Sequence, residues 1–155
     1  MKVMKRRKFI EQLTYSTGIL VFPFNIKTFM KPHINIVAST FSVTETINRL
    51  VAVLQKNGAI IYERIDQQNE LQQVGIVIRP YQVILFGNPK SGGPILQVNP
   101  LAGMDLPLKV ICWEDEQRKV WLGYKDIFHF ALTFELPAKL ILNLDLGPVI
   151  KSALQ

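Results

Sequence analysis

The chain has one cysteine and two histidines among its 155 residues, and these shortages exclude several classes of protein. Cys112 alone provides neither an internal disulfide nor a multi-cysteine zinc site. His33 and His129 are too few for a histidine-based metal centre, and we expect neither a metal nor a cofactor. A bilayer-spanning run of about 20 apolar residues is also missing. Because hydrophobic side chains make up 48% and charged ones 19%, the chain is not disordered throughout.

The positive charge of the chain is confined to its beginning. The formal net charge is +6, and residues 1–31 carry seven basic side chains against one acidic one. Residues 32–155 carry eleven of each sign, so this part is neutral. A protein that binds nucleic acid needs a basic face on its folded domain to displace counterions from phosphates. We therefore expect no nucleic-acid partner.

Residues 1–31 have the order of an export signal, with a basic start followed by an apolar stretch over residues 13–24. The pair Arg6-Arg7, followed by Phe9 and Ile10, resembles a bacterial twin-arginine signal. We expect a targeting segment, and a periplasmic or cell-envelope location if that segment functions; otherwise the protein is cytoplasmic. No small-x-small cleavage site follows, so the segment can also remain attached to the domain. The alternative is a basic amphipathic helix lying on the domain or on a membrane surface.

Residues 35–155 predict a single α+β domain, and its clearest element is a helix over residues 43–57. Ser42 and Glu45 have the spacing of a capping box, in which each side chain bonds a backbone amide near the helix start. One helical face is apolar because Ile47, Leu50, Val51 and Leu54 recur at helical spacing. Gly58 follows as a residue that ends helices.

Short apolar runs predict five strands, at residues 34–41, 59–65, 82–86, 108–113 and 119–124. The acidic segment 114–118 joins the last two as a hairpin, and residues after Asp126 predict one or two helices that Gly147-Pro148 interrupts. We expect a mostly antiparallel sheet of four to five strands, with the capped helix and the C-terminal helices packed on it. The strands are apolar on both sides, so the second face needs another helix, a second subunit or a ligand.

Two blocks of sequence are distinctive: residues 86–90, Phe-Gly-Asn-Pro-Lys, and residues 105–107, Asp-Leu-Pro. With the segments around them, from about residue 39 to 135, they resemble domain-of-unknown-function family 302. The resemblance implies a small α+β domain with helices on an antiparallel sheet and frequent homodimers, and it brings no agreed activity. This chain has Gln67 where relatives commonly have histidine, and Gly93 where they have threonine. Both changes argue against a function that depends on those side chains.

No catalytic set is evident, and whether the protein is an enzyme stays open, with the balance against it. Gly87 and Gly92 have the spacing of a phosphate-binding loop, but Gly93-Pro94 stands where that motif has Lys-Ser/Thr. The glycines are better explained by a turn between a strand and a helix. Cys112 lies in the middle of an apolar strand, which predicts an inert thiol rather than a nucleophile paired with His129.

The residues that we predict for a ligand site lie where strands end. They are Asp66, Gly87, Asn88, Lys90 and Asp105. Such loop residues are commonly presented by a rigid scaffold for binding. The sequence favours an exported module that binds a small molecule or a second copy of itself. The alternatives are a small enzyme using Asp66, Lys90 and Asp105 around residues 87–93, and an accessory protein of the cell envelope.

Overall fold

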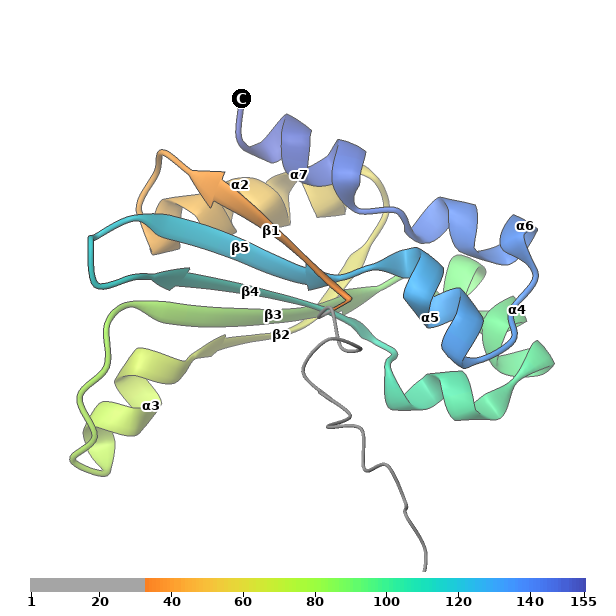
Figure 1. Ribbon diagram of the computed structural model, residues 1–155, viewed down its shortest axis with the longest axis horizontal. Coiled ribbons are helices and arrows are strands. Elements are labelled where there is room, and N and C mark those ends of the chain that lie inside the picture. Colours follow the sequence, from red (N-terminus) through yellow and green to blue (C-terminus); the bar gives the residue numbers. More distant parts are fainter. Residues whose placement is uncertain (1–32) are drawn as a thin grey trace, which may run out of the picture. The chain divides into compact units, whose positions relative to one another are not determined.

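A five-stranded antiparallel sheet forms the centre of the protein in the computed structural model, which describes residues 33–155 (Figure 1). The predicted targeting segment, residues 1–31, lies outside the described residues. The elements follow in the order β1 (Ile34–Ser39), α2 (Val43–Lys56), β2 (Ile60–Asp66), α3 (Gln67–Gln73), β3 (Tyr81–Gly87), α4 (Pro89–Val98), the 3₁₀ helix η2 (Pro100–Met104), β4 (Leu108–Glu114), β5 (Val120–Lys125), α5 (Ile127–Thr133), α6 (Ala138–Ile141), the 3₁₀ helix η3 (Leu142–Leu144) and α7 (Gly147–Ala153).

The strands lie in the order β1-β5-β4-β3-β2, and every neighbouring pair is antiparallel. The α+β fold predicted from the sequence is therefore confirmed, and each predicted strand lies within two residues of its observed bounds. A register shift between Ile61 and Glu63 leaves Tyr62 as an extra residue in β2. Such a bulge turns the strand and changes where its side chains point.

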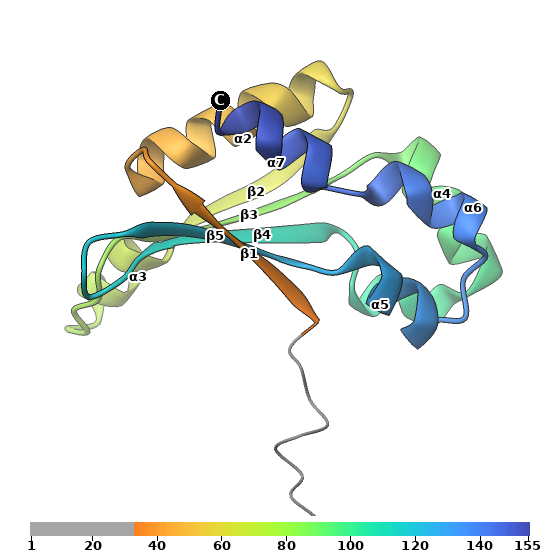
Figure 2. The same ribbon diagram turned by 45° about the horizontal axis from the view of Figure 1, so that its top comes forward.

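Helices α2 and α7 lie on one face of the sheet, as Figure 2 shows. The apolar stripe of α2 supplies Ile47, Leu50 and Leu54, all 3% exposed or less. These side chains pack in one cluster with the inward residues of the central strands, which are Ile84, Phe86, Val110, Cys112 and Leu122. Each fully buried aliphatic side chain stabilises the fold by about 1.5–3 kcal/mol relative to exposure. This cluster is the main core.

The opposite face of the sheet is apolar and only partly covered. Its residues alternate with those of the core and include Val83, Leu85, Ile111, Trp113 and Trp121, all half-buried. No helix among residues 33–155 lies across this face (Figure 2). We call these five residues the open face. Of the three covers expected for this face, a helix, a second subunit or a ligand, residues 33–155 do not supply the helix.

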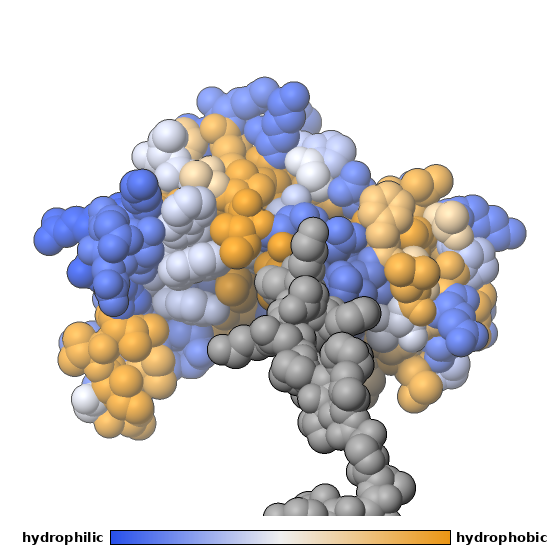
Figure 3. All heavy atoms as spheres, viewed as in Figure 1, coloured by the Kyte–Doolittle hydropathy of each residue, from blue (hydrophilic) through white to orange (hydrophobic). Residues whose placement is uncertain are grey.

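A second hydrophobic cluster lies at one end of the sheet, where α4, α5, α6, η2 and η3 gather (Figure 1). Ile95, Ala102, Phe130 and Ile141 are its most buried members, each 3% exposed or less. Other hydrophobic residues stay exposed at this end of the protein (Figure 3). Leu108, the first residue of β4, packs against both clusters. The two cores therefore meet beside Leu108.

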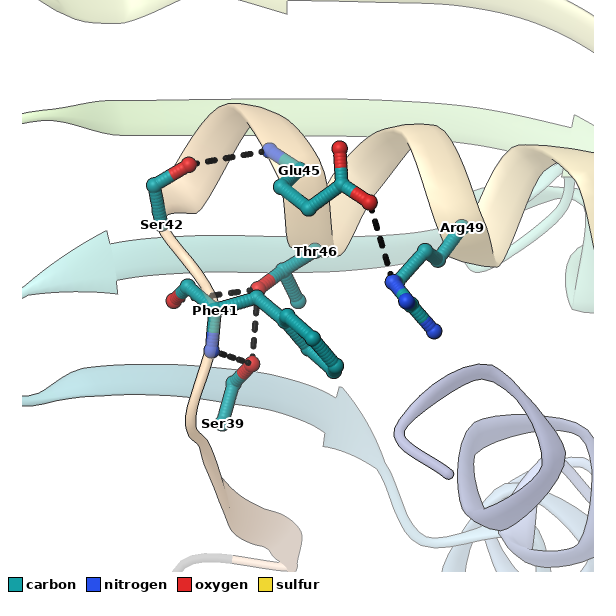
Figure 4. A network of polar contacts seen from close by, with 6 residues as sticks. All are labelled: Ser39, Phe41, Ser42, Glu45, Thr46 and Arg49. Atoms are coloured by element: carbon teal, nitrogen blue, oxygen red, sulfur yellow. Dashed lines mark hydrogen bonds and ion pairs between the residues drawn. The ribbon is translucent and has the colours of Figure 1, made fainter.

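The start of α2 differs in one respect from the capping box that the sequence predicted (Figure 4). The Ser42 hydroxyl accepts a hydrogen bond from the Glu45 amide at 3.2 Å, as expected. The Glu45 carboxylate, however, accepts from Arg49 Nε at 3.0 Å one turn later instead of reaching back. Arg49 in turn lies 3.9 Å from the centre of the Phe41 ring. A charged partner attracts the carboxylate more strongly than a neutral amide does, so only half of the box forms.

Two further segments differ from their predicted form. We expected the glycines of residues 87–94 to form a turn, but Gly92 and Gly93 lie inside α4, which also contains Pro94. Asn88 caps this helix by accepting from the Lys90 amide at 2.9 Å, and Pro89 stands in its first turn, where proline is favourable. Gly147-Pro148, expected to break a helix, begins α7 for the same reason.

The half-formed box predicts unequal effects of two substitutions. Ser42→Ala removes the acceptor of the Glu45 amide and should lower the free energy of unfolding by about 1 kcal/mol. Glu45→Gln removes only an exposed ion pair and should cost less than about 0.5 kcal/mol. Urea denaturation followed by circular dichroism measures both. Equal losses would mean that the Glu45 carboxylate contributes to the cap after all.

Candidate functional site

A cavity of about 520 Å³ opens at the end of the sheet where β3 leaves for α4. Its walls come from the turn between α2 and β2, the end of β3, the first half of α4, the segment before β4 and the connection from η3 to α7. The apolar lining residues include Leu54, Phe86, Leu96, Leu106, Leu108, Leu144, Leu146 and Val149. The cavity therefore lies where the two hydrophobic clusters meet.

Four glycines explain why this place is hollow: Gly87, Gly92, Gly93 and Gly103 all line the cavity and contribute no side chain. A Cβ atom added at Gly92 would lie 4.0 Å from Leu106 Cδ1, an ordinary van der Waals contact. One added at Gly93 would have nothing within 4 Å. A methyl group therefore fits at Gly92 and Gly93 without steric conflict.

Gly87 is the exception, because Tyr62 lies close to it. A Cβ atom at Gly87 would be 3.2 Å from the Tyr62 ring, which is tighter than normal side-chain contacts. The bulge in β2 brings this ring over the end of β3. Because Gly87 has no side chain, the Tyr62 phenol has room to lie at the wall of the cavity.

The polar lining is sparse. It consists of Asn57, Tyr62, Asn88, Ser91, Asn143 and Asp145, of which Asp145 alone carries a charge. Asn88 is occupied with holding the fold, since its amide nitrogen also donates to the Gly58 carbonyl at 3.1 Å. The Asp145 carboxylate accepts from the Gly147 amide at 2.9 Å at the start of α7. The site is thus an apolar pocket with a few polar groups.

The structure brings only part of the predicted ligand site together. Gly87 and Asn88 line the cavity, as their place at the end of β3 suggested. Lys90 is an exposed residue in the first turn of α4 and is not in the lining. A ligand-binding role for Gly87 and Asn88 stays a prediction.

The two aspartates of that prediction lie elsewhere. Asp66 pairs with Gln82, at the end of β3 opposite to Gly87 and about 17 Å away along the strand. There its carboxylate caps α3 by accepting from the Asn69 amide at 3.0 Å. Asp105 forms an ion pair with Lys125. The antiparallel register sends the end of β2 to the edge opposite the end of β3, so Asp66 does not share a polar mouth with Lys90. Asp105 precedes β4, at the same end of the sheet as Gly87.

Asp105 instead lines a second, smaller cavity of about 240 Å³. This cavity is bounded by the start of β4, the end of β5 and the beginning of α5, and Lys109, Tyr124 and Lys125 contribute to its wall. Pro107, Leu108, Leu144 and Leu146 belong to the walls of both cavities. Sequence reasoning missed Leu144 and Leu146 because nothing in a leucine-rich C-terminal stretch distinguishes a cavity wall from a core.

The candidate nucleophile is inert, as predicted. Cys112 is fully buried on the core side of β4, and this burial raises the pKa of its thiol to about 12 despite a hydrogen bond with Thr46. The thiolate that nucleophilic chemistry needs is therefore absent near neutral pH. The rings of His33 and His129 stack at 3.5 Å, away from Cys112 on β4. Within residues 33–155, no three His, Cys, Asp or Glu side chains lie close enough to hold a metal ion.

Two further side chains have shifted pKa values, one in the wall of the second cavity and one at the hairpin. Burial raises the pKa of Tyr124, and the negative charges of Asp145 and Asp126 raise it further. At the hairpin, the Trp121 indole donates to Asp115 at 2.7 Å and holds the pKa of that carboxyl below its usual value, helped by the Lys119 and Gln117 amides. Tyr124 thus stays a neutral phenol in the wall of the second cavity.

None of the helices in residues 33–155 combines the length and the apolar character needed to cross a bilayer.

These features define a small α+β domain with a two-helix cover on an antiparallel sheet and an apolar cavity at its end. The model of the family described as domain of unknown function DUF302 matches residues 35–141, and the chain belongs to this family. The resemblance found in the sequence is thereby confirmed. The crystal structure of an uncharacterized conserved DUF302 protein from Bacillus stearothermophilus has the same fold, with a TM-score of 0.67 over 79% of this chain and 96% of that one, at 21% identity.

Curated proteins also contain a similar segment. Fluoride-specific ion channel FluC 1 of Brucella suis biovar 1 is 37% identical over 90 residues, which are 58% of this chain and 35% of that protein. Fluoride-specific ion channel FluC 2 of Brucella melitensis biotype 1 is also 37% identical over 90 residues, 58% of this chain and 33% of that protein. The chain therefore spans about a third of the length of these curated relatives.

Proposed function

We propose that this domain binds a small, mainly apolar molecule in the cavity at the end of the sheet. One observation carries the proposal: the cavity holds about 520 Å³. Ligand sites typically have roughly 300–1,000 Å³ and mostly apolar walls with a few polar groups that orient the ligand. The lining here has that composition.

Binding accounts for the site better than catalysis does. The residues of the enzyme alternative, Asp66, Lys90 and Asp105, serve as a helix cap, an exposed helix residue and an ion-pair partner. The lining offers no histidine, cysteine or lysine to act as a base or nucleophile. General acid–base work needs a positioned group within hydrogen-bond reach of the substrate, and Asp145 alone would have to supply it.

A neutral fluorescent probe tests the proposal. N-phenyl-1-naphthylamine should gain fluorescence on the wild-type chain, and Gly92→Phe should raise its Kd by about tenfold or more because the added ring occupies the cavity. Gly92→Ala is the matched control, because its single methyl group fits beside Leu106 and leaves the volume open.

Thermal unfolding of both variants checks that the fold is intact, and alanine should if anything stabilise α4. An unchanged Kd for Gly92→Phe would contradict the proposal, as would a wild-type chain that binds no probe.

A second proposal concerns the open face, which we assign to self-association. The supporting observation is the row of Val83, Leu85, Ile111, Trp113 and Trp121, which residues 33–155 cover only partly. A sheet of five strands of six or seven residues spans about 20 by 20 Å. Protruding side chains increase its accessible area, so the area that each copy would bury approaches that of the smaller specific interfaces. A second copy offers the same flat apolar surface, so the two sheets pack face to face.

Charge placed on the open face should prevent this association. Val83→Lys puts an ammonium group in the middle of the interface and should raise the dimer Kd by about 100-fold. Val98→Lys is the control, since the same change is made at the exposed end of α4. Sedimentation velocity over a concentration series measures both. A wild-type monomer at all concentrations, or equal effects of the two variants, would refute the assignment.

We also propose that the protein works in the cell envelope as an accessory module. The basic and apolar order of residues 1–31 supports export. A similar segment occurs in curated proteins named fluoride-specific ion channels, and this supports the proposal.

The paired arginines provide the test of export. Arg6→Lys combined with Arg7→Lys keeps the charge but alters the pair that the export receptor recognises. In a bacterial host with a twin-arginine system, the periplasmic fraction of the full chain should fall about tenfold or more, because the export receptor recognises the arginine pair. Immunoblots of the cell fractions measure this. Lys2→Arg is the control. Equal distribution of the three proteins would exclude twin-arginine export.

A further inference from the structure

The wall of the larger cavity carries charge of one sign only. Asp145 is its single ionised side chain, and no lysine, arginine or histidine among residues 33–155 belongs to the lining. In the chain, Asp145 stands between Leu144 and Leu146, which are each 8% exposed, whereas Asp145 itself is exposed. The carboxylate therefore lies at the solvent-exposed rim of a mainly apolar wall.

The Asp145 carboxylate has room for a further partner. Its Oδ1 atom accepts from the Gly147 amide at 2.9 Å, and no other hydrogen bond or ion pair within residues 33–155 reaches this side chain. A carboxylate has about four acceptor positions, so most of them are open to water or to a ligand. Asn143, two residues earlier, also lines the cavity and adds an amide oxygen as an acceptor.

Three lysines follow or precede lining residues in the chain, but none of them belongs to the wall. Lys56 and Lys90 are exposed, at the end of α2 and in the first turn of α4. Lys109 follows Leu108 in β4, and because side chains alternate along a strand, it lies on the face opposite to the core. Water and salt screen such exposed charges, so the group that a ligand touches, Asp145, determines which charge is preferred.

Tyr124 on β5 shows that the charge around Asp145 is negative. Burial raises the pKa of Tyr124, and the negative charges of Asp145 and Asp126 raise it further. The basic residue next to Tyr124, Lys125, is paired with Asp105. A cation is therefore favoured at Asp145 and an anion is disfavoured.

We propose that the larger cavity takes a primary amine with an apolar body, whose ammonium group pairs with Asp145. The inference rests on the proposed function and names the ligand class of the same cavity. An ammonium group donates up to three hydrogen bonds, and the Asp145 carboxylate and the Asn143 amide oxygen accept them. The apolar body supplies most of the affinity, and the ion pair decides between ligands of equal size.

Three compounds with similar alkyl bodies test this preference on the full chain: n-octylamine, n-octanol and n-octanoate. Each displaces N-phenyl-1-naphthylamine at neutral pH and low salt. The Kd of the amine should be about fivefold below that of the alcohol, as expected for an exposed ion pair, and octanoate should bind most weakly. Salt of about 1 M should remove most of the difference between amine and alcohol by screening. An amine that binds no better than the alcohol at low salt would overturn the inference.

Asp145→Asn removes the charge and keeps an oxygen that accepts from the Gly147 amide. It should raise the Kd of octylamine by about fivefold and leave that of octanol within about twofold. Glu116→Gln is the matched control, because it removes one negative charge from an exposed residue of the hairpin, outside the lining. Equal effects of the two variants would mean that octylamine responds to net charge and not to Asp145, which contradicts the inference.

The outcomes separate the ammonium site from the simpler pocket. If the probe binds as proposed but the amine has no advantage over the alcohol, the pocket stands and the ammonium site is wrong. If Gly92→Phe weakens the probe but leaves the Kd of octylamine unchanged, the amine binds outside the cavity and the inference is wrong. If Asp145→Asn does not fold, the comparison of amine and alcohol on the wild type at low and high salt decides. If the wild type binds neither probe nor amine, both proposals fail.

Discussion

Helix α2 packs along one face of the sheet through Ile47, Leu50 and Leu54, and the arrangement of the other elements follows from this contact. The helix touches β2, β3 and β4, and α7 lies beside it on the same face (Figure 2). Because the two helices fill this face, the chain between α6 and α7 has to cross the end of the sheet. The cavity is built from that crossing segment, the strand ends beneath it and the first half of α4.

Polar groups fix how α2 sits on the strands. The buried Thr46 hydroxyl bonds Ser39 at 2.7 Å, and Gln82 on β3 donates to Thr44 at 3.3 Å (Figure 4 shows the Ser39–Thr46 pair). Arg64 on β2 donates to Gln82 at 2.9 Å and to Asn48 of α2 at 2.7 Å. Apolar packing is tolerant of small shifts along a sheet, whereas a hydrogen bond is lost within a fraction of an ångström. These bonds therefore select one register of the helix.

Two of the incompletely covered apolar surfaces within residues 33–155 have a structural cause. Helices α2 and α7 cover one face, and no helix among residues 33–155 lies across the tryptophans and aliphatic residues of the open face. Four glycines at the junction of the two clusters leave the cavity unfilled. Exposed apolar patches of this kind mark interaction sites in soluble domains. A bound molecule and a second copy of the chain are the partners that we propose for these surfaces.

The sequence by itself determined the five strands, helix α2 and the hairpin, but not helix α4. Hydrophobic periodicity and the Ser42 cap predicted α2, alternating apolar runs predicted the strands, and residues 114–118 predicted the hairpin, because these signals act between residues close in the chain. Only the tertiary structure decided which strand ends share an edge, and so separated Asp66 from Gly87. It also decided that Leu144 and Leu146 border a cavity. Cavities arise from how side chains far apart in the chain fail to fill space together, and no local pattern records that.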